Sequence, residues 1–260
     1  MKQLITILLT LTIGFAQSLL KEEKQIRSYI DNHTNEAIDL VEKVVNINSG
    51  TINFKGNKKV GKIFQAELDK LGFKTYWVTY PKEIKRSGHL FAEMRGGKGQ
   101  NILLIGHLDT VFEPDHPFQK YTRKGDTAYG PGVSDMKAGD VSMIYIMKAL
   151  DKIGVLHDLN LTLAFTGDEE KTGGPVSIVR KELVEAGKWA NIGLGFEGTV
   201  GMNTGTIARR SSSSWVLTTT GIQGHSSQIF KDQLGYGAIF EASRILNAFR
   251  EELAPEEYLT

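Results

Sequence analysis

The chain has 260 residues, of which 40% are hydrophobic, and this is enough for one large domain or two smaller ones. Its 31 lysines and arginines nearly balance its 30 acids, so the charge gives no indication of a nucleic-acid partner. The chain contains no cysteine, which excludes disulfides and thiolate metal sites; any bound metal must be held by imidazole and carboxylate groups.

Residues 1–17 are predicted to be a secretory signal peptide. Met1 and Lys2 supply a short positive region, residues 4–15 are almost wholly apolar or threonine, and residues 14–16 offer small side chains for cleavage. The apolar run is too short for a comfortable membrane span of about 20 residues. A buried core helix is the alternative, but the position at the N-terminus favours export. We therefore expect a periplasmic or secreted protein that has no membrane attachment once the signal is cleaved.

The next part of the chain predicts two helices and two strands. Apolar residues recur at three- and four-residue steps over 19–48 and 58–71, as they do on amphipathic helices. Residues 73–78 and 90–94 alternate like strands. Helices followed by strands in this order indicate a mixed sheet at the start of an α/β domain.

The central strand is predicted at 102–105, where four apolar residues follow one another as in a strand buried on both faces. His107 and Asp109 come directly after it, at the carboxyl end where open α/β sheets place ligand sites. On an extended backbone these two side chains point the same way. They are either a polar turn after a core strand or a metal-ligating imidazole with its carboxylate partner.

A helix is predicted over 136–153, and Asp135 lies at its start after the glycine-rich residues 130–132. An N-cap aspartate is common at such a position and needs no function. The functional alternative is a carboxylate held so that both its oxygens are free for metals.

More acids follow two further predicted strands. The strand at 159–165 runs into Asp168, Glu169 and Glu170, and a helix at 176–188 precedes a short strand at 192–196 that ends at Glu197. Three adjacent acids are ordinarily a solvated loop, since burial without cations is unfavourable. Metal-capable side chains at several strand ends indicate a metal centre more strongly than any one of them does.

The order and spacing of four motifs resemble those of the co-catalytic zinc exopeptidases of metallopeptidase family 20. The motifs are GHLDTV, GPGVSDMKAG, TGDEEKTG and FEGT. Its members include glutamate carboxypeptidase, aminoacylase, acetylornithine deacetylase and succinyl-diaminopimelate desuccinylase. The resemblance extends from about residue 38 to the end of the chain. It implies a three-layer α/β zinc-exopeptidase (phosphorylase/hydrolase-like) domain with a mixed, largely parallel sheet over 18–208, and the start of an inserted α+β lid and dimerisation domain over 209–260.

The resemblance also implies two Zn²⁺ ions, with Co²⁺ or Mn²⁺ as alternatives. His107 and Glu197 would ligate one ion and Glu170 the other, with Asp135 bridging both. Glu169 would be the general base that passes the proton of a water to the leaving amine. Asp109 would orient His107. The family further implies a cis peptide bond between Asp135 and Met136.

The last part of the chain has a different composition. Arg209, Arg210 and the serines at 211–214 indicate a linker, residues 215–223 alternate like a strand, and a helix is predicted over 234–253. In the family this region begins the lid that forms a homodimer, and the histidine matching His225 reaches into the partner's active site to stabilise the oxyanion. Without the resemblance, His225 is an ordinary surface-loop histidine.

One departure concerns the second metal site, which the family closes with a histidine late in a longer chain. The remaining histidines lie in predicted helix, loop or turn segments outside the motifs and are interpreted as ordinary: His33, His89, His116 and His157. The chain is therefore expected to be a C-terminally truncated fragment that binds at most about one zinc tightly and is inactive or weakly active alone.

These observations favour an exported two-metal hydrolase that cleaves an amide bond next to a free carboxylate. Its substrate would be a small peptide, as for a carboxypeptidase, or an N-acyl amino acid, as for a deacylase. A non-catalytic metal- or peptide-binding protein with the same fold is the alternative from another class. Glu169 separates these alternatives, because a metal binder has no need of a second, non-ligating glutamate beside Glu170.

Overall fold

The computed structural model describes residues 19–201, 204–208, 214–235 and 237–253. The predicted signal peptide and most of the predicted linker at 209–214 lie outside these ranges. The described residues belong to two compact units, one within 1–204 and the other within 205–260. The predicted domain boundary at 208–209 adjoins residues that are not described. In the part of the chain that the structure describes, no helix is long and apolar enough to cross a membrane.

The first unit is built around a five-stranded mixed sheet with the order β1-β2-β6-β3-β7. The strands are β1 Lys74–Val78, β2 His89–Arg95, β3 Lys98–His107, β6 Leu159–Thr166 and β7 Ile192–Gly195. β3 pairs in parallel with β6 and β7, whereas β2 pairs antiparallel with β1 and β6. The predicted mixed sheet is therefore confirmed, and the carboxyl ends of β3, β6 and β7 meet at one edge.

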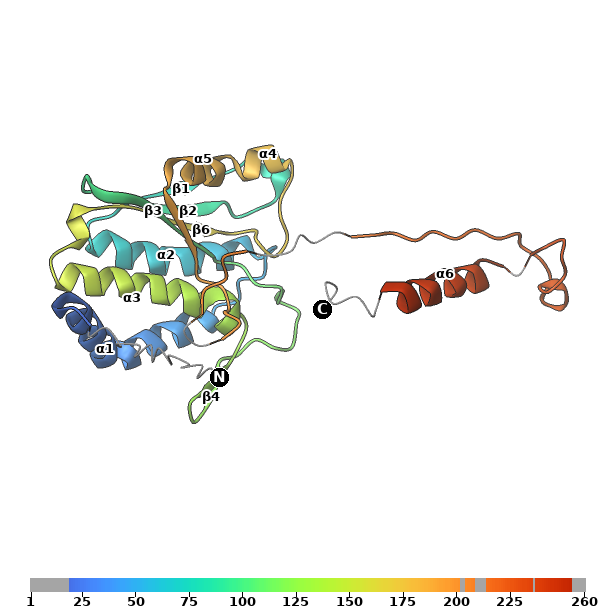
Figure 1. Ribbon diagram of the computed structural model, residues 1–260, viewed down its shortest axis with the longest axis horizontal. Coiled ribbons are helices and arrows are strands. Elements are labelled where there is room, and N and C mark those ends of the chain that lie inside the picture. The colour runs from blue at the N-terminus through green and yellow to red at the C-terminus, as the bar shows by residue number, and fades with distance from the viewer. Residues whose placement is uncertain (1–18, 202–203, 209–213, 236, 254–260) are drawn as a thin grey trace, which may run out of the picture. The chain divides into compact units, whose positions relative to one another are not determined.

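Helices cover both faces of this sheet (Figure 1). The helices α1 Lys21–Val45, α2 Phe54–Lys70 and α3 Ala138–Lys152 lie on one face, and the shorter α4 Val176–Val179 and α5 Lys181–Trp189 lie on the other. α2 begins four residues earlier than predicted because Asn53 caps it, accepting a hydrogen bond from the Gly56 amide. The three layers agree with the predicted fold class.

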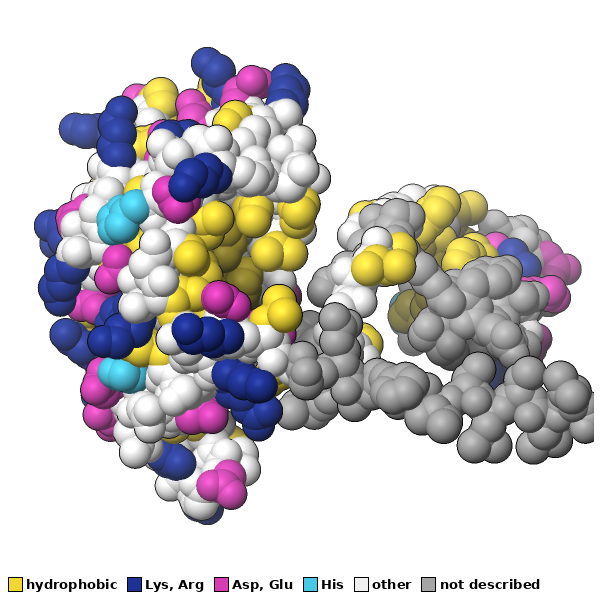
Figure 2. Space-filling model, turned by 60° about the vertical axis from the view of Figure 1, so that its left-hand side comes forward, with side chains coloured by type: hydrophobic (Ala, Val, Ile, Leu, Met, Phe, Trp, Pro, Cys, Tyr) yellow, Lys and Arg dark blue, Asp and Glu magenta, His cyan; other side chains and the backbone are white. Residues whose placement is uncertain are grey.

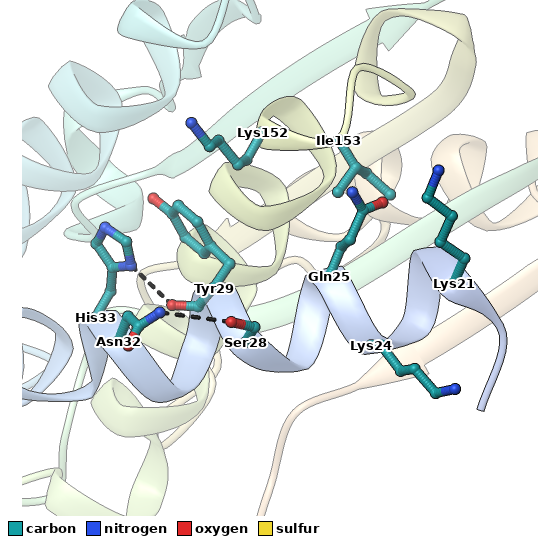
Figure 3. A pocket seen from close by; sticks show the side chains of 9 residues that line it. All are labelled: Lys21, Lys24, Gln25, Ser28, Tyr29, Asn32, His33, Lys152 and Ile153. Atoms are coloured by element: carbon teal, nitrogen blue, oxygen red, sulfur yellow. Dashed lines mark hydrogen bonds between the residues drawn. The ribbon is translucent and has the colours of Figure 1, made fainter. Parts of the chain in front are cut away.

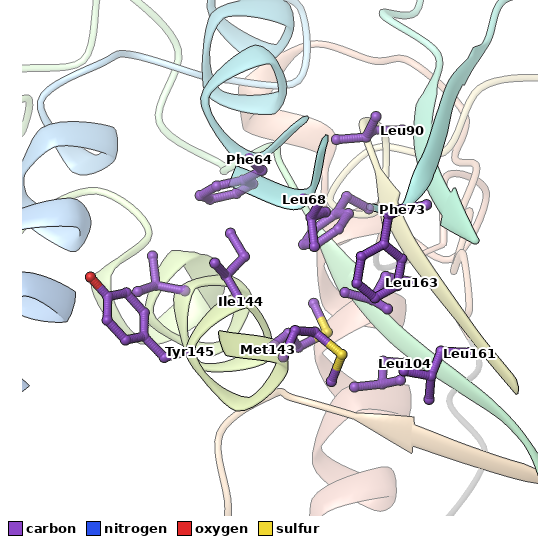
Figure 4. Close-up of a cluster of buried hydrophobic side chains, with 14 of the residues drawn as sticks. Phe64, Leu68, Phe73, Leu90, Leu104, Met143, Ile144, Tyr145, Leu161 and Leu163 are labelled. Carbon is purple, nitrogen blue, oxygen red and sulfur yellow. The ribbon is translucent and has the colours of Figure 1, made fainter. Parts of the chain in front are cut away.

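The larger hydrophobic core fills the space between the sheet and α1, α2 and α3 (Figure 4). Phe64 and Leu68 of α2 and Met143 and Ile144 of α3 are fully buried there against side chains of the strands. A smaller core packs Leu183 and Ala186 of α5 against the opposite face of the sheet. Amphipathic helices on a buried sheet thus explain the apolar periodicity of the sequence.

Two predicted helices differ in detail. The helix expected at 176–188 is interrupted at Arg180, which separates α4 from α5. The helix expected from residue 136 begins at Ala138, because Val133–Lys137 form a single π-turn in which Asp135 and Met136 are not helical. The second irregular point includes Asp135, one of the predicted metal ligands.

Short elements complete the first unit. β4 Thr122–Lys124 and β5 Thr127–Tyr129 form a small separate hairpin, and 3₁₀ turns occupy Lys82–Ile84 and Leu156–Asp158. On one face of this unit, hydrophobic side chains gather between lysines, arginines and acids (Figure 2). The edge strand β7 contributes exposed apolar residues of its own, since Ile192 and Leu194 are each 43% exposed.

The second unit contains α6 Gly237–Leu253 and a 3₁₀ turn at Ser226–Gln228. The predicted C-terminal helix is present, although it starts three residues later than expected. The strand predicted at 215–223 is wrong, because these residues form no ladder in the structure. A strand needs a neighbour for its backbone hydrogen bonds, and an alternating pattern alone does not supply one.

Candidate metal centre

Three of the predicted metal ligands lie together at the carboxyl edge of the sheet. His107 ends β3, Asp135 lies in the π-turn before α3, and Glu197 follows β7. His107 Nε2 is 2.8 Å from Asp135 Oδ1 and 3.4 Å from Glu197 Oε1. Among the described residues this is the one group of three or more His, Asp or Glu side chains close enough to hold a metal, with ligand atoms within 4.8 Å of one another. One imidazole and two carboxylates supply three protein ligands of types that bind zinc, so these residues fit a metal ion.

The imidazole of His107 is buried and oriented by its neighbours. Its Nδ1 lies 3.0 Å from the main-chain oxygen of Asp109 and 3.5 Å from the Oδ1 atom of that residue. Because a carbonyl oxygen only accepts hydrogen bonds, Nδ1 carries a proton and Nε2 is the atom that faces the carboxylates. The contact of His107 with the main chain of Asp109 was not anticipated from the sequence, and the orienting role of Asp109 stays a prediction.

The carboxylate of Asp109 connects three segments. It is buried and accepts hydrogen bonds from Thr51 Oγ1 at 2.7 Å, from the Glu169 amide at 3.0 Å and from the Glu170 amide at 3.1 Å. Burial opposes its charge, but these hydrogen bonds and the bond to His107 lower the pKa of Asp109. Asp109 consequently holds the backbone of both glutamates beside His107.

Glu169 and Glu170 occupy the loop after β6. Glu169 Oε2 lies 4.0 Å from His107 Nε2, which sets this carboxylate next to the three-residue group. Glu170 is outside that group, although Asp135 is its foremost charged neighbour. Burial and the neighbouring carboxylate of Asp135 raise the pKa of Glu170 to about 7. A bound cation would relieve this repulsion between acids.

The charge balance of the centre favours a cation. Burial opposes protonation of His107, yet its hydrogen bond to Asp109 and the surrounding carboxylates raise its pKa to about 10. The excess of negative charge thus keeps a proton on the ring. A divalent metal would replace that proton and satisfy the same carboxylates.

Asp135 is not a helix cap. Its peptide bond to Met136 is cis, as the family resemblance predicts, and its φ and ψ of −128° and 95° lie outside the helical region. The N-cap of α3 is Lys137, and it makes no side-chain capping bond. The side chain of Asp135 is directed to His107 instead, which favours the ligand interpretation over the capping one.

The residues that follow Asp135 fix this turn to the core. Lys137 is fully buried, and its Nζ donates to the main-chain oxygens of Val44 and Ile47 at 3.1 Å each. Asp140 is also fully buried, and within the described residues its carboxylate oxygens have no hydrogen-bond partner. Burial is the foremost reason that the pKa of Asp140 is well above its ordinary value.

One histidine prediction is wrong. His89 lies in β2, not in a loop or turn, and it is fully buried with both ring nitrogens engaged. Two further residues were not predicted from the sequence. Thr51 contacts Asp109, which is distant in the chain, and Arg180 contacts Asp168 across a loop. No local pattern marks these residues, because their roles depend on tertiary contacts.

The remaining predicted site residue, His225, lies in the second unit. It is exposed, it precedes the 3₁₀ turn, and its Nδ1 accepts a hydrogen bond from the Ser227 amide. Its action in a partner's site stays a prediction.

A separate pocket of about 590 Å³ lies along α1 near the end of α3 (Figure 3). Tyr29 and His33 stack there with ring centroids 3.9 Å apart, and three lysines line the rim. None of the predicted site residues lines this pocket.

Comparison with known proteins agrees with the arrangement at the sheet edge. Residues 103–248 match the family described as Peptidase family M20/M25/M40. The chain belongs to this family. The matched range begins within β3 and includes His107, Asp135, Glu169, Glu170 and Glu197.

Curated M20 relatives include two kinds of hydrolase. Carboxypeptidase G2 of a Pseudomonas strain is 32% identical over 217 residues, which are 80% of this chain and 49% of that protein. The succinyl-diaminopimelate desuccinylase of Bordetella petrii is 32% identical over 143 residues, 50% of this chain and 37% of that protein. The chain thus spans about half or less of the length of these relatives.

Solved structures show the same fold. Human carnosine dipeptidase 1 superposes with a TM-score of 0.56 at 18% identity, covering 76% of this chain and 43% of that one. An M20 family metallo-carboxypeptidase of Sulfolobus solfataricus gives a TM-score of 0.50 at 21% identity, covering 63% and 37%. The chain is an M20 family protein with a mixed α/β fold.

Proposed function

We propose that this protein is a zinc-dependent exopeptidase that cleaves an amide bond next to a free carboxylate in a small peptide. The observation that carries the proposal is the convergence of His107, Asp135 and Glu197 on one point, with the carboxylate of Glu169 beside them. The similarity to carboxypeptidase G2 supports the peptide substrate. Export, with a periplasmic or secreted location, is part of the proposal and rests on the N-terminal sequence.

The proposed role of each side chain is the one that the family resemblance implies. His107, Asp135 and Glu197 would hold one metal, and Glu170 together with Asp135 would hold a second. The chemistry that bound metal ions supply is polarisation of the scissile carbonyl and a lower pKa for an attacking water. Glu169 accepts the proton of that water and gives it to the leaving amine. His225 from a partner's lid stabilises the negative charge that develops on the carbonyl oxygen.

N-acyl amino acids are the second candidate substrate class. The similarity to succinyl-diaminopimelate desuccinylases favours it, since these relatives are named for removing a succinyl group. Hydrolysis of dipeptides and of N-acyl amino acids by the zinc-loaded protein, measured in parallel, distinguishes the two. Metal binding by the full-length protein with no hydrolysis of either class would favour a non-catalytic binding protein.

The role of Glu169 is tested by Glu169→Gln. Glutamine keeps the size of the side chain but cannot take the proton, so turnover should fall by about 10²–10⁴-fold while the metal content stays unchanged. Stopped assays together with elemental analysis measure both quantities. Loss of zinc in this variant would make Glu169 a ligand and contradict its assignment as the base.

A further inference from the structure

The loop that bears Glu169 and Glu170 is held by a second set of polar groups in addition to Asp109. This loop, residues 167–173, follows β6, and its backbone is held at most positions. The Glu169 and Glu170 amides donate to Asp109, as described above. The other anchors are His89, Asp168 and Arg180.

His89 holds the start of the loop. It is fully buried, its Nδ1 accepts from the Gly167 amide at 3.1 Å, and its Nε2 donates to the main-chain oxygen of Val179 at 2.9 Å. The ring therefore links the end of β6 to the end of α4. A hydrogen bond from Ser87 Oγ to the Gly167 oxygen, at 3.2 Å, holds the same residue through its carbonyl group.

Asp168 joins the two ends of the loop, and Arg180 neutralises the charge of Asp168. One carboxylate oxygen of the fully buried Asp168 accepts from the Gly173 amide at 2.8 Å, and the other pairs with the guanidinium of Arg180. Arg180 also donates to the main-chain oxygen of Asp168 at 3.1 Å and to Thr172 Oγ1 at 3.2 Å. The interruption between α4 and α5 falls at Arg180.

We propose that Arg180 is a positioning residue that acts through Asp168 to hold Glu169 and Glu170 at the metal centre. This inference rests on the proposed function, because it assumes that the two glutamates serve as base and ligand. A buried carboxylate without its counter-charge is strongly unfavourable, so removal of Arg180 draws Asp168 and the loop toward water. Glu169 and Glu170 are the next two residues after Asp168. Small displacements of a metal ligand reduce metal binding, and small displacements of a base reduce turnover.

The test compares Arg180→Met with Lys181→Met, a matched control that removes the neighbouring exposed lysine at the start of α5. In Arg180→Met, the amide hydrogens of residues 168–173 should exchange with solvent at least about tenfold faster than in the unaltered protein. The kcat of this variant should be about 10–100-fold lower, with KM little changed. Zinc affinity should fall within the same range. Arg180→Lys should recover part of each quantity, and Lys181→Met should leave all of them unchanged.

The double variant Arg180→Met/Asp168→Asn separates positioning from an unpaired charge. It removes both charges, so its thermal stability should return toward that of the unaltered protein while the fast loop exchange and low kcat persist. Recovery of kcat in the double variant would overturn the proposal, as would unchanged loop exchange in Arg180→Met. If the full-length protein hydrolyses no substrate, the proposed function fails, whereas loop exchange and zinc affinity still decide the role of Arg180.

Discussion

The protonation state of His107 decides whether this side chain can bind a metal. Burial favours the neutral ring, but Asp109 and the nearby carboxylates raise its pKa to about 10, so the metal-free protein holds a proton there at neutral pH. A metal binds only the deprotonated ring. Metal and proton therefore compete for the same nitrogen.

This competition predicts proton release on metal binding. Near pH 7 about one proton should leave His107 per metal bound, and the apparent affinity should rise about tenfold per pH unit up to a pH of about 10. Calorimetric titration with Zn²⁺ in buffers of different ionisation enthalpy measures the released protons. The His107→Ala variant is the control and should not bind zinc at this site. If it does not, a zinc affinity of the unaltered protein that stays constant between pH 6 and 8 would contradict the competition.

Among the expected ligands, Asp135 should have the largest influence on zinc binding. Because it is assigned to both metals, Asp135→Asn should reduce zinc stoichiometry and affinity, by about tenfold or more. Elemental analysis after dialysis measures the loss, with Asp126→Asn in the exposed turn after β4 as a matched control. Unchanged metal content in Asp135→Asn would exclude the bridging role.

At the scale of elements, the site depends on the close approach of α3 to the sheet edge. A Cβ at Gly139 would lie 2.1 Å from the main-chain oxygen of Phe196, and a Cβ at Gly106 would lie 2.0 Å from Asp140 Oδ1. Glycine at these positions lets the helix pack against the strand ends. This contact sets the distance between Asp135, which precedes α3, and Glu197, which follows Phe196.

Gly139→Ala should therefore weaken both the fold and the site. Forcing the helix away from residue 196 should lower the free energy of unfolding by about 1–3 kcal/mol and reduce zinc affinity. Gly187→Ala is the control, because Gly187 lies in α5 with open space around its Cβ position and should raise stability by about 0.5–1 kcal/mol. Urea unfolding with zinc titration measures both variants. Equal stability of the two would show that the helix can shift without cost.

At the scale of the whole molecule, catalysis is expected to require two copies of the chain. His225 lies in the second unit, outside the unit that holds His107, Asp135 and Glu197. His225→Ala should lower turnover without loss of metal, because the ring would stabilise an oxyanion and not ligate.

Hybrid dimers test this assignment. Mixing His225→Ala subunits with Glu169→Gln subunits should restore part of the activity, since one of the two sites then has both an intact base and an intact partner histidine. Subunit exchange is verified by native mass spectrometry. No recovery in a mixture that exchanges would remove His225 from the partner's site.

The sequence by itself determined the order of the elements and the residues at their ends. Apolar periodicity indicates α1, α2, β3 and β6, because burial of one face or two faces leaves a regular pattern along the chain. Since carboxyl ends of parallel strands meet at one edge, the acids after β6 and β7 could be expected near His107. The strand expected at 215–223 was wrong, since β-pairing depends on a partner that local alternation does not specify.

Only the tertiary structure decided what holds these residues in place. Thr51 bonds Asp109 across 58 positions of sequence, and His89 receives the Gly167 amide across 78. Asp168 was expected in a solvated loop but is buried, because Arg180 supplies its counter-charge. A side chain's type and spacing indicate the chemistry it can perform, whereas its burial and partners depend on segments that the fold brings together.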